Sequence, residues 1–231
     1  MARGIPVIAK LIFVGTALLL PYALSAQATS DEAVQRSNEG VELLKQSKFS
    51  EAIDPLLKAV GLNPTDSNVR LNLAYAYDRQ GRLEEAIIHY QKAIELNPRD
   101  SIARNNLGVL YNKAGRYDEA IRELEKTLEI DPKSATAPKN LETAKKNQSA
   151  LQEREKRIAE AVKNVESNPE NASAHYNLAR LYAFYDKKDL AIPSLEKALK
   201  LGYSDIGYVK VDTALDSIRN EPDYVWLLRG R

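Results

Sequence analysis

Residues 67–100, SNVRLNLAYAYDRQGRLEEAIIHYQKAIELNPRD, decide the fold of this chain. An apolar stripe at helical spacing runs from Leu71 to Tyr77 and indicates a first helix. Gly81 follows it, and glycine tolerates the left-handed turn with which helices end. A second stripe runs from Leu83 to Ile94 and stops at Asn97-Pro98, because proline disfavours helix in the residue before it. The stretch therefore predicts two antiparallel helices joined by a tight turn.

The same pattern recurs at a step of 34 residues on both sides of this stretch. The tripeptide Glu-Ala-Ile and a proline after Asn or Asp keep this step, at Glu51, Glu85 and Glu119 and at Pro64, Pro98 and Pro132. The alanine of each tripeptide is a small residue where the two helices of a pair must approach closely. Asp66 and Asp100 precede first helices and are expected to accept hydrogen bonds from free helix amides.

These markers resemble the tetratricopeptide repeat, which has this length and these residue types. The resemblance implies an all-α, right-handed superhelical solenoid of antiparallel helix pairs, with a long helix in the middle and a C-terminal helical cap. It covers about residues 33–231. The expected division is three repeats over 33–134, at 33–66, 67–100 and 101–134, then 135–171, a further repeat at 172–205 and the cap at 206–231.

Residues 135–171 allow two interpretations with equal support. The spacing of the flanking motifs leaves room for one degenerate repeat, although no glycine marks its turn. A seam at alternating steps of three and four, from Leu141 to Val165, indicates instead one long connecting helix. The seam is apolar except at Gln148 and Glu155. Such a helix covers the edge of the third repeat or offers a seam for dimerisation.

The C-terminal segment resembles the closing element of many bacterial tetratricopeptide-repeat chains. Solenoids need a terminal element that covers the open apolar end of the stack. We expect this role for Leu215, Ile218, Tyr224, Trp226 and Leu227, and so interpret Trp226 as a cap or core residue.

The first 26 residues have the three-part pattern of a secretory signal peptide. Arg3 and Lys10 precede an apolar run that ends in small residues, and the expected cleavage is after Ala26. The alternative is a retained membrane anchor, but the run from Leu11 to Leu24 is shorter than the roughly 20 residues that span a bilayer. The predicted location is therefore periplasmic or secreted, with membrane contact only in transit.

Charge and composition exclude several classes of function. Removal of residues 1–26 changes the net charge from +1 to −1, which leaves no basic field to capture nucleic acid. The chain has no cysteine and two histidines that lie far apart, so neither a catalytic site nor a metal site is expected, and no cofactor. We expect His89 to be solvated and His175 to be packed.

The resemblance places a concave binding groove on the first helix of each pair. In the second and third repeats and in the last one, the groove positions correspond to Asn68, Leu71, Tyr75, Asp78, Arg79, Asn105, Val109, Asn112, Lys113, Tyr176, Arg180 and Phe184. Amides and aromatic rings of this kind suit an extended peptide. The lysine, arginine and asparagine clamp with which some relatives hold a chaperone C-terminus is matched here at Asn72 alone, so that partner is not carried over.

The predicted function is that of an exported scaffold that binds a peptide or protein segment in this groove and is not an enzyme. The alternative is a structural envelope protein that assembles with itself, as a homodimer or a larger homo-oligomer.

Overall fold

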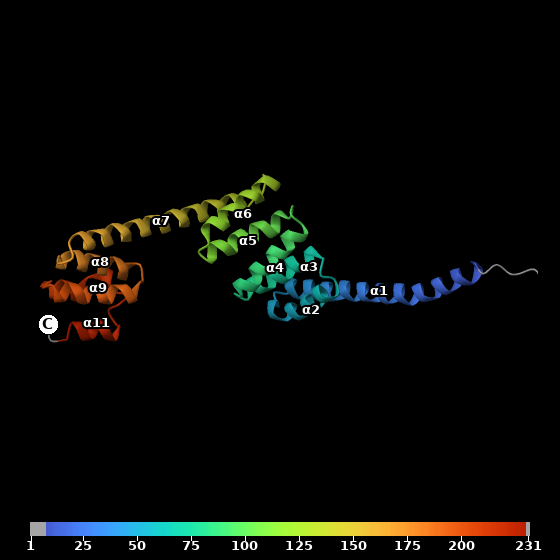
Figure 1. Ribbon diagram of the computed structural model, residues 1–231, viewed down its shortest axis with the longest axis horizontal. Coiled ribbons are helices and arrows are strands. Elements are labelled where there is room, and N and C mark those ends of the chain that lie inside the picture. The colour runs from blue at the N-terminus through green and yellow to red at the C-terminus, as the bar shows by residue number, and fades with distance from the viewer. Residues whose placement is uncertain (1–7, 230–231) are drawn as a thin grey trace, which may run out of the picture. The chain divides into compact units, whose positions relative to one another are not determined.

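The computed structural model describes the backbone of residues 8–229 and the side chains of residues 27–229. This part of the chain is helical and contains no β-strand, which confirms the predicted fold class (Figure 1). It divides into two compact units, with the boundary between Asn147 and Gln148. None of its helices is both long enough and apolar enough to span a bilayer.

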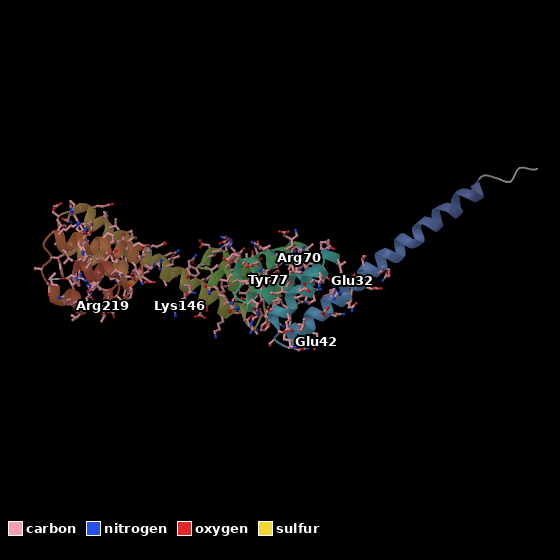
Figure 2. The ribbon with its side chains drawn as sticks, turned by 90° about the horizontal axis from the view of Figure 1, so that it is seen from below. Glu32, Glu42, Arg70, Tyr77, Lys146 and Arg219 are labelled. Atoms are coloured by element: carbon pink, nitrogen blue, oxygen red, sulfur yellow. The ribbon has the colours of Figure 1, made fainter. Side chains whose placement is uncertain are left out.

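Unit 1 is a stack of antiparallel helix pairs. Its helices are α1 (Ile8–Lys45), α2 (Phe49–Leu62), α3 (Ser67–Arg79), α4 (Leu83–Leu96), α5 (Ser101–Lys113), α6 (Tyr117–Ile130) and the first part of α7 (Ala137–Ser167). Neighbouring helices pack in chain order, α1 on α2, α2 on α3, and so on to α6. Tyr77, labelled in Figure 2, is buried in this stack.

Small residues allow the close helix contacts that the sequence predicts. Ala52, Ala86 and Ala120 are fully buried. Gly108 on α5 faces Leu124 on α6, and a Cβ atom added there would lie 2.6 Å from the Leu124 Cγ atom. The Asp66 and Asp100 carboxylates accept hydrogen bonds from free amides of α3 and α5, as predicted.

Two kinds of residue occupy the left-handed turns within the pairs. Gly81 and Gly115 have φ of 74° in the turns before α4 and α6. Ser47, before α2, and Asp186, in unit 2, have φ of 60° and 56°, a backbone conformation that costs energy for a residue with a side chain.

The middle segment is one continuous helix, α7, rather than a repeat broken by a turn. Residues 139–168 contain neither proline nor glycine, so nothing in the sequence ends the helix. Leu141 and Ala144 pack on the apolar core of unit 1. The predicted repeat boundaries themselves stay predictions.

Unit 2 contains the rest of α7, one helix pair and the C-terminal cap. The elements after α7 are α8 (Ala172–Phe184), α9 (Lys188–Lys200), α10 (Ile206–Val211), the short 3₁₀ helix η1 (Thr213–Leu215) and α11 (Pro222–Leu227). The predicted cap residues Leu215, Ile218, Tyr224 and Leu227 are buried.

The prediction for Trp226 is wrong, because its side chain is 67% exposed. The buried residues Tyr224 and Leu227 of α11, and Leu228 directly after it, are three and four positions apart and share one face. Trp226 is two positions from Tyr224, so it lies on the opposite face.

Candidate functional site

Polar side chains of α3, α5 and the first part of α7 meet along one side of unit 1, which we call the first-helix surface. The Lys113 Nζ donates to the Asp78 carboxylate at 2.8 Å, which joins α5 to α3. The Asn140 and Asn147 amides of α7 donate to the Asn105 and Asn112 carbonyl oxygens of α5, each at 3.0 Å. The first bond places predicted groove residues of α3 and α5 side by side, and the other two join predicted groove residues of α5 to α7.

Asn140 and Asn147 are functional candidates that the sequence interpretation missed. All four asparagines of the two pairs are partly exposed. Asn105 and Asn112 are seven residues apart, and the same spacing recurs 35 residues later at Asn140 and Asn147. That recurrence was the available signal, and it indicates that the start of α7 acts as a further first helix.

Aromatic and cationic side chains form the α3 part of this surface. The Arg79 guanidinium lies 4.3 Å from the centre of the Phe49 ring and donates to the Tyr75 hydroxyl at 2.7 Å. The Phe49 and Tyr75 rings meet edge to face at 5.9 Å. Asn68 is exposed, and Leu71 and Val109 are partly buried.

Of the three predicted groove residues of α8, one is buried and cannot contact a partner, and two border a cleft. Tyr176 is buried, stacks on Tyr203 at 4.1 Å and donates its hydroxyl to Asp212 at 2.8 Å, so it is withdrawn as a groove contact. The C-terminal segment covers it. Arg180 is partly exposed and Phe184 is exposed.

The cleft has a volume of about 550 Å³ and lies within unit 2. Its walls come from α7, α8 and η1, and include Arg157, Glu160, Asn164, Asn177, Arg180, Phe184 and Ala214. The Arg157 guanidinium donates to the Tyr185 hydroxyl at 3.2 Å, and the Arg180 Nε lies 2.5 Å from Asp212. Both cations are therefore held by internal partners.

Asp212 is a buried carboxylate with a lowered pKa. Burial alone raises the pKa of an acid, but the hydrogen bonds from Tyr176, the Ala214 amide and Arg180 outweigh burial and stabilise the charged form. Burial and the nearby Asp212 raise the pKa of Tyr176 well above that of a free tyrosine, so this ring stays neutral. The cluster fixes the cap to α8.

The prediction from the sequence is confirmed for His175 but not for His89. His175 is buried and its Nε2 lies 2.9 Å from the Pro169 carbonyl oxygen, which confirms packing. His89 is not simply solvated: it stacks on Tyr77 at 5.4 Å, and partial burial lowers its pKa. Within residues 27–229, no three acidic or histidine side chains are grouped as metal ligands.

Comparisons with known proteins show what the chain resembles. Tetratricopeptide-repeat models match residues 43–89, 68–133 and 172–201. A chloroplastic protein of Arabidopsis thaliana is 35% identical over 71 residues, which are 30% of this chain and 21% of that protein. The match thus spans about a fifth of the curated relative.

Two solved structures share the fold. The tetratricopeptide-repeat domain of Sgt2 from Aspergillus fumigatus is 26% identical with a TM-score of 0.50, over 53% of this chain and 82% of that one. The first such domain of human RPAP3 is 24% identical with a TM-score of 0.51, over 54% and 98%. With its repeated motif, its stacked helix pairs and these matches, the chain belongs to the tetratricopeptide-repeat family.

Proposed function

We propose that this protein is an exported, non-catalytic scaffold that holds a segment of another polypeptide on its first-helix surface. Tetratricopeptide-repeat domains are scaffolds for protein–protein interactions. A protein or peptide is thus the class of partner that the family supports, and the first-helix surface is the part of this chain that suits it best.

One observation carries the choice of surface, namely the two asparagine pairs that join α5 and α7. An asparagine side chain has two N–H donors and a carbonyl acceptor, and the bond within each pair uses only one donor and one acceptor. In the first pair, the Asn105 amide also donates to the Asn106 carbonyl oxygen at 3.4 Å. The Asn112 amide group and the Asn147 carbonyl oxygen are not used by the bond between them. Such groups match the alternating N–H and C=O groups of an extended peptide.

The aromatic part of the surface adds apolar contact area beside these amides. Tyr75 is partly exposed, and its ring is held in place by Phe49 and Arg79. A ring that is already ordered loses little conformational entropy when a ligand covers it. The α3 part of the surface therefore suits an apolar side chain of the bound segment.

Replacing Asn112 and Asn147 together by Ala tests the surface. Both partners of the pair are removed, so no unpaired polar group stays behind and stability changes by less than about 1 kcal/mol. We expect capture of partner from envelope extract to fall about tenfold by quantitative mass spectrometry, because a bound segment loses its amide contacts. Circular dichroism checks that the helices are retained.

Lys92→Ala with Glu95→Ala on α4 is the matched control. These exposed side chains form an ion pair on a second helix, so their removal also leaves the net charge unchanged. Equal loss of capture in both double variants, or unchanged capture in the asparagine variant, places the binding site elsewhere.

The export part of the proposal rests on the N-terminal sequence. Helix α1 runs from Ile8 to Lys45, across the predicted cleavage point after Ala26. Residues 27–32 are exposed, and Ala33 is the first buried residue among the described side chains. Glu32, labelled in Figure 2, is the last of these exposed residues. Cleavage after Ala26 thus leaves the described packed part of α1 intact.

We expect the protein recovered from the envelope to begin at Gln27. It is expected to melt within about 2 °C of the full chain, because the described packing of α1 begins at Ala33, after the cleavage point. Intact-mass measurement and a thermal melt check the two statements. An intact N-terminus in the mature protein favours the retained anchor instead.

A further inference from the structure

The Trp226 side chain is not part of the buried core of the cap. It is the single tryptophan of the chain and is 67% exposed, and its neighbour Val225 is 49% exposed. Exposed tryptophan is unusual, since the ring has a large apolar area that gains from burial. Tryptophan is also the residue type most often found at the energetic centre of a protein interface.

Two hollows flank this side chain on the surface of α9 and α11, which we call the Trp226 surface. One has a volume of about 290 Å³ and is lined by Glu196, Leu199, Lys200, Trp226, Leu227 and Arg229. The other has about 270 Å³ and is lined by Ile192, Pro193, Glu196, Asp223, Trp226 and Leu227. Pockets for small molecules hold about 300–1,000 Å³, so each hollow suits a single large side chain.

The charges of the two hollows are opposite. Lys200 and Arg229 border the first, and Asp223 borders the second, while Glu196 borders both. Lys200 bonds to Glu196 on its own helix, an exposed pair of little energetic weight. Within the described residues, Asp223 and Arg229 form no salt bridge. A basic side and an acidic side therefore lie on either side of Trp226.

This arrangement is complementary to itself. In a two-fold symmetric dimer, the same patch is used by both subunits, so each feature must meet its own complement. The Trp226 surface supplies both a protruding ring and a hollow for it, and both an acidic and a basic edge. A partner of different sequence explains the ring, but it does not require a matching hollow and both charges on one patch.

We propose that the Trp226 surface binds a second copy of this chain, with Trp226 of each subunit seated in a hollow of the other and Asp223 opposite Arg229. The Trp226 surface belongs to unit 2 and shares no residue with the first-helix surface of unit 1. Two linked copies then hold two segments of a partner, which raises the avidity for repeated or oligomeric partners.

Sedimentation velocity of the mature chain over a range of concentrations tests the proposal, together with the emission of Trp226. We expect a monomer–dimer equilibrium and an emission maximum that shifts to shorter wavelength as dimer forms. Trp226→Ala is expected to stay monomeric at all concentrations with an unchanged melt. Phe184→Ala, which removes an equally exposed ring from α8, is the control and keeps the dimer.

Charge reversal gives the second arm of the test. Asp223→Arg and Arg229→Asp are each expected to raise the dimer Kd about tenfold, because each places like charges opposite one another. The double variant restores the opposite charges and is expected to recover dimerisation. A monomer at every concentration, a dimer that survives Trp226→Ala, or a double variant no better than the single ones overturns the proposal.

Discussion

Asp212→Ala is expected to lower the free energy of unfolding of unit 2 by about 2–3 kcal/mol. Asp212 is 4% exposed and accepts from the Tyr176 hydroxyl, Arg180 and the Ala214 amide, so its loss leaves three donors without their acceptor. Removing one partner of a buried ion pair costs about 3–5 kcal/mol. Arg180 is partly exposed and regains water, which places the expected loss below that range.

The emission of Trp226 reports on this loss, because the single tryptophan lies in unit 2. Urea unfolding followed by emission at low protein concentration gives the change in stability. Asp216→Ala is the control. Asp216 is largely exposed and, among the described residues, its carboxylate pairs only with Arg219 three residues away, so its removal is expected to cost less than about 0.5 kcal/mol. Equal effects of the two variants contradict a special role of Asp212.

The effect of Asp212→Ala depends on pH in a defined direction. The pKa of Asp212 is lower in the folded chain than in the unfolded chain, because its hydrogen bonds and Arg180 outweigh the cost of burial. Its contribution is therefore fully present above the unfolded pKa of about 4 and is lost as the pH falls through the folded value. We expect the wild type and the variant to differ most at neutral pH and to converge below about pH 4.

Gly108→Val is expected to destabilise unit 1 by about 2–3 kcal/mol. The added Cβ atom meets the Leu124 Cγ at 2.6 Å and the Ala120 carbonyl oxygen at 3.2 Å, and Leu124 is fully buried. Overpacking of this kind costs about 1–3 kcal/mol, and β-branching adds a second clash. The better helix propensity of valine recovers only a few tenths of a kcal/mol.

Helical circular dichroism and Trp226 emission together locate this effect. We expect the dichroism melt to lose stability while the emission transition of unit 2 moves little. Gly61→Ala on α2 is the control, because its Cβ atom meets nothing within 4 Å, and it is expected to gain about 0.5 kcal/mol. An unchanged melt for Gly108→Val contradicts the close approach of α5 and α6.

Features with a local physical cause were predictable from the sequence. The recurrence of alanine and proline at a step of 34 residues predicted the helix pairs, because a small residue or a helix breaker affects the structure at its own position. Asp66 and Asp100 were predictable because capping involves amides two or three residues away. The absence of glycine and proline between 139 and 168 agreed with one long helix, but motif spacing alone left both interpretations open.

Features that depend on distant contacts were not predictable with the same certainty. Tyr176 occupies a groove position of its helix, yet the chain returns 36 residues later and Asp212 binds its hydroxyl. Asn140 and Asn147 look like ordinary polar residues of a solvated helix until their partners on α5 are known. Trp226 was misassigned because the resemblance to a closing element, rather than the position of each residue around helix α11, decided the interpretation.

The left-handed turns at Ser47 and Asp186 bear on how the stack comes apart. A residue with a side chain pays about 1–2 kcal/mol for this backbone conformation, whereas Gly81 and Gly115 adopt it freely. The strain therefore sits in the α1–α2 pair at the end of unit 1 and in the α8–α9 pair of unit 2. In a linear array, fraying spreads inward from the ends. The α3–α4 and α5–α6 pairs are thus expected to unfold last. Helices that have frayed can then refold onto these unstrained pairs.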